Sequence, residues 1–304
     1  MKGHVYTLKS DCYVVSHLAV VSPHSILSNF LNYYLCLNKP CLLIKDAAYP
    51  SISLKDIENL YIPIPPLTEQ ERIVSELDLL TSIINKQKAQ LKELDSLAQS
   101  IFYDMFGDPI VNPKGWEVKK LGEISKIGTG ATPSRDKEDI YFNGNIAWVK
   151  TTEVNNCEIL NTEEKITQLA IEQTNCKIYP PQTILMAMYG QGKTRGQIAI
   201  LKIHAATNQA CAAILLDNAI CNTNFIFELL HIKYEDIRSM AQGGNQANLN
   251  MKLVGSIPIP LPPLSLQQSF ASKIEAIEAQ KALITKSMEE TQRLFDSRMD
   301  YWFA

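Results

Sequence analysis

The most regular hydrophobic pattern in the chain extends from Thr68 to Met105, where apolar residues recur at alternating steps of four and three. This is the heptad pattern of a helix that buries one stripe of side chains against a facing helix. One position in the stripe is polar, Gln87. We call the stripe the first seam; its residues are Ile73, Leu77, Leu80, Ile84, Gln87, Leu91, Leu94, Ala98, Ile101 and Met105.

The sequence also marks the two ends of this helix. Thr68 is followed three residues later by Glu71, which is the spacing of a capping box. Pro66 disfavours an earlier start, and Gly107 favours termination. At about 1.5 Å per residue the helix would be on the order of 57 Å long, which is too long for an ordinary core helix. The pattern therefore predicts a spacer.

A second copy of the pattern begins 197 residues later. Ile62–Gln70 reads I-P-I-P-P-L-T-E-Q, and Ile259–Gln267 reads I-P-L-P-P-L-S-L-Q. Two seamed helices of equal length with a whole domain between them predict an antiparallel pair. The second seam, which includes three polar positions, consists of Phe270, Ile274, Ile277, Lys281, Ile284, Met288, Thr291, Phe295, Arg298 and Trp302.

The repeat also extends upstream of the seams. Ser28–Leu31 resembles Thr223–Ile226, so the first copy is a shortened version of the end of the second. If Met1 is the true start, nothing in the first copy corresponds to residues of about 112–195. We therefore expect residues 1–61 to form an incomplete domain with an exposed apolar face.

The segment between the two predicted helices forms the one full-length globular domain. It contains short β-type runs at 146–150, 183–188, 197–203 and 210–216, and a helical pattern from 224 to about 240. The fold class predicted is mixed α/β, with a globular domain and two long antiparallel coiled-coil helices. The predicted segments are 1–61, a partial domain; 62–107, a helical region; 108–258, the intact domain; and 259–304, a second helical region.

The composition is that of an ordinary globular protein, with 46% apolar and 20% charged residues. No apolar run approaches the length of a membrane span, and no export signal follows Met1. The seven cysteines include no C-x-x-C pair, so we expect free thiols in a reducing cytoplasm. The net charge of −3 argues against a bulk polyanion binder but allows a local basic face.

Gly192-Lys193-Thr194 resembles the end of a phosphate-binding loop. The first glycine of that motif would fall at Ala187, however, and the residues from Gly196 onward read as a strand instead of the required helix. We therefore expect a strand–loop–strand hairpin, whose polar tip either contacts a ligand or is a solvated turn.

Several polar side chains in the predicted loops have the chemistry of DNA contacts. Arg and Lys donate to phosphates or to guanine, and Asn and Gln pair with the edge of adenine. Amides are also ordinary loop residues, so both interpretations stay open at this point. The strongest candidates are Arg135, Lys150, Tyr189, Gln191, Lys193, Thr194 and Arg195, and the weaker candidates are Asn208, Gln209, Asn245 and Gln246.

No catalytic constellation is evident in the sequence. The five histidines are scattered, and there is no metalloprotease, nucleophile-elbow or cofactor-loop motif. We therefore expect a chain that is not an enzyme and that binds neither a metal nor a cofactor of its own.

At this point a family resemblance is supported by particular residues. The two I-P-x-P-P-L segments before long helices, together with Met105–Pro109, Asn112–Trp116 and Leu121–Ile124, resemble the conserved regions of type I restriction–modification specificity (S) subunits. The Gly130–Ser134 turn and the Gly192–Gly196 hairpin are similar to the target-recognition domains of that family. The resemblance covers nearly the whole chain.

The resemblance implies a non-catalytic cytoplasmic subunit in which two target-recognition domains read the halves of a bipartite site in double-stranded DNA. It also implies partner methyltransferase (M) subunits, which carry S-adenosylmethionine, and a motor–nuclease (R) subunit. A spacer of the predicted length corresponds to roughly 17 base pairs at 3.4 Å each.

The shortened first copy is where the chain departs from the family pattern. Such a subunit would self-associate with a second copy to read a symmetric site, be completed by another chain, or be an inactive allele. A coiled-coil scaffold that binds methyltransferase subunits without reading DNA is a competing interpretation. An enzyme with an unrecognised active site is another.

Overall fold

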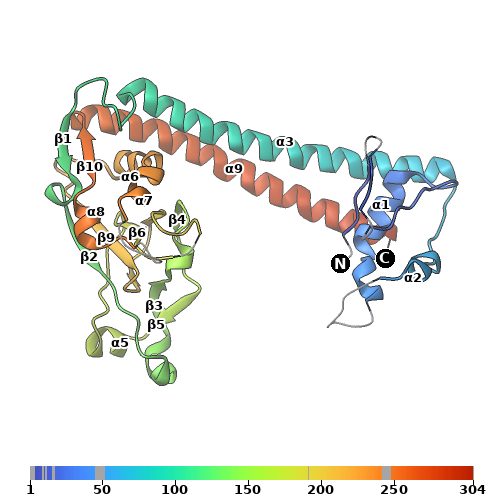
Figure 1. Ribbon diagram of the computed structural model, residues 1–304, viewed down its shortest axis with the longest axis horizontal. Helices are drawn as coiled ribbons and strands as arrows, with labels where there is room; N and C mark the ends of the chain where they lie inside the picture. The colour runs from blue at the N-terminus through green and yellow to red at the C-terminus, as the bar shows by residue number, and fades with distance from the viewer. Residues whose placement is uncertain are drawn as a thin grey trace. The chain divides into compact units, whose positions relative to one another are not determined.

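The computed structural model describes residues 4–8, 10, 12–15, 18–44, 52–190, 192–241 and 248–303. The chain divides into two compact units: unit 1 contains residues 1–94 and 280–304, and unit 2 contains residues 95–279. All strands assigned to the described residues lie in unit 2 (Figure 1). The predicted mixed α/β class with two long helices is confirmed, while the predicted segment boundaries stay predictions.

The elements of the described residues fall into helices, short 3-10 turns and strands. The helices are α1 (Ser28–Leu37), α2 (Leu54–Glu58), α3 (Leu67–Phe106), α4 (Glu138–Tyr141), α5 (Gln168–Gln173), α6 (Thr223–Ile232), α7 (Tyr234–Ser239), α8 (Met251–Gly255) and α9 (Leu264–Phe303). The 3-10 turns are η1 (Pro40–Leu43), η2 (Leu121–Glu123), η3 (Arg135–Lys137) and η4 (Thr151–Glu153). The strands are β1 (Glu117–Lys120), β2 (Ser125–Thr129), β3 (Phe142–Val149), β4 (Cys157–Ile159), β5 (Glu164–Ile166), β6 (Ile184–Ala187), β7 (Ile198–Leu201), β8 (Ala205–Thr207), β9 (Cys211–Leu216) and β10 (Pro258–Leu261).

The two predicted long helices are α3 and α9, each of 40 residues, and both ends of α9 lie 197 residues after the ends of α3. In unit 1, Gln87 donates a hydrogen bond to Ser287 at 3.0 Å, and Arg298 donates to Glu76 at 3.0 Å. The residue numbers rise along one helix as they fall along the other, so the helices are antiparallel (Figure 1). Neither these helices nor any other helix of the described residues is long and apolar enough to cross a membrane.

Helix α3 begins one residue before the predicted start. Leu67 is the first residue of α3, so Thr68 lies inside the first turn and not at the cap position that the predicted capping box requires. The carbonyl of Pro66 accepts the N–H of Gln70 at 3.1 Å. The proline carbonyl therefore opens the helical hydrogen-bond ladder one residue earlier than the side-chain pattern indicated.

Burial along the helices follows the predicted seams. In the first seam Leu77 is fully buried and Leu80 is 8% exposed, whereas the neighbouring Leu79 is 62% exposed. The polar position Arg298 of the second seam is half-buried; it pairs with Glu76 and also lies 4.9 Å from the centroid of the Trp302 ring. The polar seam positions are therefore compatible with the pairing, because at least one of them forms a cross-helix ion pair.

Unit 2 is built in layers around a five-stranded sheet of order β2-β9-β6-β7-β4. Helix α6 covers one face of this sheet and buries Phe225 and Leu229 against it. The three-stranded sheet β5-β3-β8 packs against the other face through Val149, and α5 covers its far side next to the buried Trp148. Strand β1 pairs with β10 in a separate two-stranded sheet.

A short helix is attached in the same way at the start of each long helix. The residue before α1, Leu27, donates its N–H to the side-chain oxygen of Gln70 at 2.8 Å, and the residue before α6, Asn222, donates to Gln267 at 2.8 Å. Each glutamine also donates to the carbonyl of the proline five residues before it, at 2.9 Å and 2.8 Å. The internal repeat of the sequence is therefore a repeat of structure.

The apolar contacts of the two short helices correspond as well. In unit 1 the ring of Phe30 on α1 lies 5.2 Å from that of Phe303 on α9, and both pack with Leu77. In unit 2 the ring of Phe225 on α6 lies 4.7 Å from that of Phe106 on α3. Each short helix thus packs where one long helix begins and the other ends.

The helix predicted from 224 to about 240 is two helices, α6 and α7. At Lys233 the backbone leaves the helical region, with φ −81° and ψ 11°. Lys233 is 6% exposed, and burial lowers the pKa of its amine. No glycine or proline marks this break, so the hydrophobic pattern could not reveal it.

Candidate nucleic-acid interface

Several loops of unit 2 converge at one edge of the five-stranded sheet. The end of β2 at Thr129 lies opposite β9, and the end of β6 at Ala187 lies opposite Cys211 at the start of β9. Strand β7 begins at Ile198 and runs antiparallel to β6, so the tip of their hairpin lies at the same edge. We call this the loop edge; its described residues are 129–134, 150–156, 188–190, 192–197 and 208–210.

The turn between β8 and β9 links the other loops of this edge. The side-chain oxygen of Asn208 accepts a hydrogen bond from the Thr151 hydroxyl at 2.9 Å. The side-chain oxygen of Gln209 accepts one from the Thr132 hydroxyl at 2.6 Å. The two amide side chains therefore join three loops through their oxygens, which makes them structural as well as candidate contact residues.

The hairpin between β6 and β7 carries four described candidates at its tip. Tyr189 is 40% exposed and Lys193 is exposed, whereas Thr194 and Arg195 are half-buried. Strand β7 follows the tip directly, as the predicted strand–loop–strand hairpin requires. A phosphate-binding loop needs a helix at this point, so the geometry does not support one.

Helix α7 holds this hairpin by its backbone. The hydroxyl of Tyr234 donates to the carbonyl of Lys193 at 2.5 Å. The guanidinium of Arg238 donates to the carbonyl of Arg195 at 3.0 Å and to the Tyr234 hydroxyl at 2.9 Å. Neither Tyr234 nor Arg238 was among the predicted residues, because the predicted helix ran through the break that precedes them; their spacing of four residues was the available signal.

Arg135 and Lys150 are both engaged by carboxylates. Arg135 contacts Glu164 at 2.7 Å, and Lys150 contacts Glu164 at 3.2 Å and Glu163 at 2.5 Å. Burial alone would raise the pKa of Glu164, but the hydrogen bonds from Arg135 and Lys150 hold that pKa below its ordinary value. Because their charge is already balanced, these two cations are less available to phosphate than Lys193 is.

An open cleft of about 400 Å³ lies beside this network. Its charged lining consists of three carboxylates and two cations: Glu138, Glu163, Glu164, Arg135 and Lys165. A lining rich in carboxylates repels phosphate groups, so we do not assign the cleft to nucleic acid.

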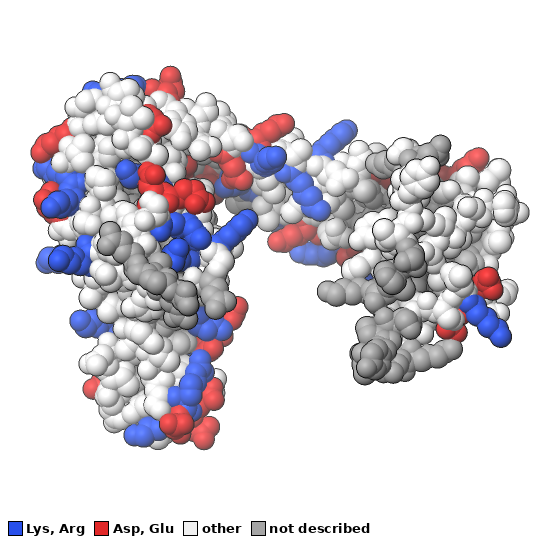
Figure 2. All heavy atoms as spheres, in the orientation of Figure 1, with Lys and Arg blue, Asp and Glu red and all other residues white. Residues whose placement is uncertain are grey.

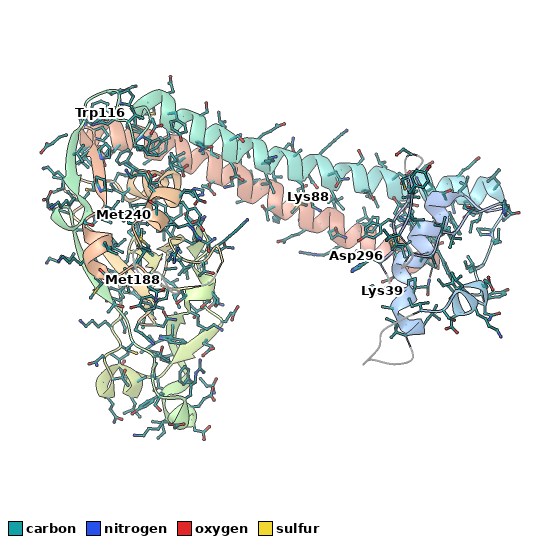
Figure 3. All side chains as sticks on the ribbon, viewed as in Figure 1. Lys39, Lys88, Trp116, Met188, Met240 and Asp296 are labelled. Carbon is teal, nitrogen blue, oxygen red and sulfur yellow. The ribbon has the colours of Figure 1, made fainter. Side chains whose placement is uncertain are left out.

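The described candidates therefore gather at the loop edge, with Arg135 connected to it through Glu164. Gln191, Asn245 and Gln246 lie outside the described residues. Figure 2 shows several Lys and Arg side chains close together near the middle of the visible face of unit 2. Figure 3 shows Met188, the residue that leads from β6 into the hairpin tip, inside this unit, where it is 3% exposed.

The structure shows little that points to metal or thiol chemistry. Within the described ranges, no group of three or more His, Cys, Asp or Glu residues is placed to hold a metal ion. All seven cysteines are free. Burial raises the pKa of the Cys221 thiol to about 11 and also raises the pKa of Cys176 and Cys211, so these three thiols are protonated at neutral pH.

Known proteins resemble this chain over most of its length. A family model described as the type I restriction modification DNA specificity domain matches residues 1–93 and 113–293. The MjaIX specificity subunit of Methanocaldococcus jannaschii is 24% identical over 280 residues, which is 85% of this chain and 64% of that protein. The EcoR124I/EcoR124II specificity subunit of Escherichia coli is 26% identical over 253 residues, which is 79% of this chain and 61% of that protein.

Among solved structures, the S subunit of a type I restriction–modification system from M. genitalium has the same fold. It matches 89% of this chain and 71% of its own with a TM-score of 0.61, at 15% sequence identity. The chain spans less than two thirds of the length of each of these two curated specificity subunits.

Proposed function

Because the chain belongs to the family of type I restriction–modification DNA specificity domains, we propose that unit 2 reads a DNA sequence through its loop edge. The observation that carries the proposal is the convergence of the candidate loops on one edge of a rigid sheet. Short loops fixed on a rigid scaffold hold side chains at set positions against base edges and phosphates.

The residues of the loop edge suit different parts of this task. On this proposal Lys193 and Arg195 donate to phosphates or to guanine, and the exposed ring of Tyr189 offers apolar contact and a hydroxyl. Asn208 and Gln209 accept hydrogen bonds through their oxygens, which leaves the amide groups as donors toward DNA. The net charge of −3 limits non-specific attraction to DNA.

We further propose that the chain catalyses no reaction itself. On this proposal the M subunits that bind it carry S-adenosylmethionine and methylate DNA, and an R subunit completes the complex in the cytoplasm. The proposal is supported by the relatives, which are specificity subunits of type I restriction enzymes. If it holds, the purified chain incubated alone with DNA and S-adenosylmethionine transfers no methyl group.

A double variant, Lys193→Ala with Arg195→Ala, tests the hairpin. Helix α7 holds the hairpin through the carbonyls of these residues, so removing both side chains leaves its backbone anchors in place. We expect site-specific methylation by the complex with M subunits to be abolished while binding of the M subunits is unchanged. The measurement is methylation of DNA carrying the recognised site, together with co-purification of the M subunits.

The control variant is Lys202→Ala, which removes a lysine at the opposite end of β7. Lys202 pairs with Glu158 at 2.7 Å and lies away from the loop edge. Methylation is expected to stay normal in this variant. Normal methylation in the double variant as well would remove the hairpin from the DNA site.

The competing function is a scaffold that binds methyltransferase subunits without reading DNA. Replacing residues 108–258 by a short linker while keeping both long helices distinguishes the two functions. If the chain is a scaffold, the shortened chain still binds the methyltransferase subunits and methylation is unchanged. If the chain reads DNA, the shortened chain still binds them but site-specific methylation is lost.

A further inference from the structure

In unit 2, strand β10 is covered by strand β1. The antiparallel register places Lys119 opposite Ile259 and Glu117 opposite Leu261. Only Ile259 and Leu261 of β10 carry a backbone N–H, because the other two residues of that strand are prolines. The pairing therefore depends on a few donors along one edge of β10.

The turn after β1 completes this cover. The N–H of Leu121 donates to the carbonyl of Ile257 at 2.9 Å, and the side chains of Leu121 and Ile124 belong to the same core cluster as Val254 and Ile259. Under this cover Val254, Ile257 and Ile259 are each no more than 1% exposed.

Unit 1 contains the counterpart of β10, and no strand of the described residues pairs with it. Shifted by 197 residues, the positions are Ile57, Leu60, Ile62 and Ile64, which we call the open edge. Three of them are half-buried, and Ile64 is 57% exposed. No backbone hydrogen bond joins the N–H of Ile62 or Ile64 to another described residue.

The open edge is held in place by the same kind of local contacts as its counterpart. Helix α2 has the bounds of α8 shifted by 197 residues, and its cap residue Ser53 accepts the N–H of Asp56 as Asn250 accepts an N–H at the start of α8. The hydroxyl of Tyr34 on α1 donates to the carbonyl of Tyr61 at 3.1 Å. An apolar segment that is held in place, and whose N–H groups bond to no other described residue, is an edge to which another strand can add.

We propose that the open edge binds a β-strand of the chemistry of β1, donated by a polypeptide segment outside residues 1–304. The strand would carry the mainly charged sequence type of Glu117–Lys120 and be followed by a turn with apolar residues at the positions of Leu121 and Ile124. In unit 2 the structure itself shows this type of strand on the equivalent surface. The inference does not depend on DNA reading by unit 2.

The charge of the open edge also fits a strand with two lysines. Asp56 and Glu58 stand where unit 2 has Leu253 and Gly255, so unit 1 presents carboxylates that its counterpart lacks. A second copy of this chain is a poorer source of the strand, because its own β1 is already paired with β10 and its Leu121 is fully buried. Glu58 stands in place of Gly255, which closely approaches Gly122 in unit 2. Binding at the open edge would therefore depend on the strand and its apolar side chains more than on a contact between two glycines.

A synthetic peptide spanning Lys114–Ser125, which contains β1 and the turn after it, serves as the probe. We expect saturable binding of the labelled peptide to the full chain, and slower hydrogen–deuterium exchange at residues 60–64 when it is bound. Ile62→Pro removes one of the N–H donors of the open edge and is expected to weaken binding by about tenfold or more.

The control variant is Leu54→Pro, which places a proline at the first position of α2, where a helix tolerates it. Leu54 is 66% exposed and outside the open edge, so peptide binding should not change. The proposal would be overturned if the peptide did not bind, or if it bound the Ile62→Pro variant as tightly as the natural chain. It would also be overturned if the peptide slowed hydrogen–deuterium exchange only at residues 258–261. Sedimentation of the chain without peptide adds a further outcome: a dimer that Ile62→Pro abolishes would identify a second copy as the occupant and also overturn it.

Discussion

Gln70 and Gln267 are buried polar residues that play the same part in the two copies. They are 1% and 0% exposed, and each accepts the N–H that precedes a short helix while donating to a proline carbonyl. An amide can accept and donate at once, which a carboxylate cannot do. This explains why glutamine ends both copies of the nine-residue repeat.

Gln267→Leu tests this role at the residue scale. We expect the free energy of unfolding to fall by about 1–3 kcal/mol, because the N–H of Asn222 and the carbonyl of Pro262 lose a buried partner. Urea unfolding followed by circular dichroism measures the change. Gln268→Leu, at the exposed neighbouring position, should change stability by no more than about 0.5 kcal/mol. Equal effects of the two variants would show that the buried amide is dispensable.

Glu76 makes the stability of unit 1 depend on pH. The hydrogen bond from Arg298 lowers the pKa of Glu76 below its ordinary value of 4.5, with a further contribution from Trp302. A carboxyl with a lowered folded-state pKa stabilises the fold above its unfolded-state pKa, and this contribution is lost as the pH falls through the folded-state pKa.

We therefore expect Glu76→Gln to be less stable than the natural chain at neutral pH and to lose less stability in acid. Unfolding midpoints in urea at about pH 7 and about pH 3.5 measure the difference. Glu71→Gln, at an exposed position of the same helix, is the control. A pH profile that Glu76→Gln leaves unchanged would contradict the assigned role of the ion pair.

At the scale of elements, the heptad pattern determines which side of each long helix is buried. The two adjacent leucines of α3 show this directly, since Leu80 is 8% exposed and Leu79 is 62% exposed. Leu80→Ala should lower the free energy of unfolding by about 2–4 kcal/mol through lost burial and the cavity left behind. Leu79→Ala should change it by no more than about 0.5 kcal/mol. Thermal or urea unfolding of the two variants, compared side by side, decides whether the seam is in this register.

The hairpin of the loop edge and helix α7 form a second pair of hydrogen-bonded elements. Tyr234→Phe removes the hydroxyl that donates to Lys193 and accepts from Arg238. We expect affinity for the recognised DNA site to fall by roughly fivefold, because about 1 kcal/mol of hairpin positioning is lost, while non-specific DNA binding is unchanged. Titrations of both DNAs with the M-subunit complex provide the measurement, and an equal loss on both would contradict a positioning role.

At the scale of the whole molecule, the features repeated along the chain were the predictable ones. The seams and the 197-residue offset involve short-range periodicity and self-similarity, so they can be read without knowing any distant contact. Phe102 and Phe106 lie outside the first seam and are buried because α6 packs there, which only the tertiary structure reveals.

The residue types of the candidate site could be recognised from the sequence, but the contacts between those residues could not. Loop residues with DNA-binding chemistry could be recognised by type, and most of those described do lie at one edge. The engagement of Arg135 by Glu164, 29 residues away, depends on how β3 and β5 align. The turn at Lys233 brings Tyr234 and Arg238 to the hairpin, and it contains no glycine or proline from which the sequence could have predicted it.

Unit 1 joins parts of the chain that are synthesised far apart in time. Phe30 packs against Phe303, and the side chain of Asn38 donates to the carbonyl of Phe303 at 3.4 Å. Unit 2, by contrast, is one continuous stretch from 95 to 279. On the ribosome, unit 2 can therefore fold before the last turn of α9, which packs against α1, has been synthesised. Closing the long loop between α1 and the end of α9 adds an entropic cost. The apolar face of α1 thus stays open to chaperones and proteases until Phe303 has been synthesised, and of the two units unit 1 is completed later.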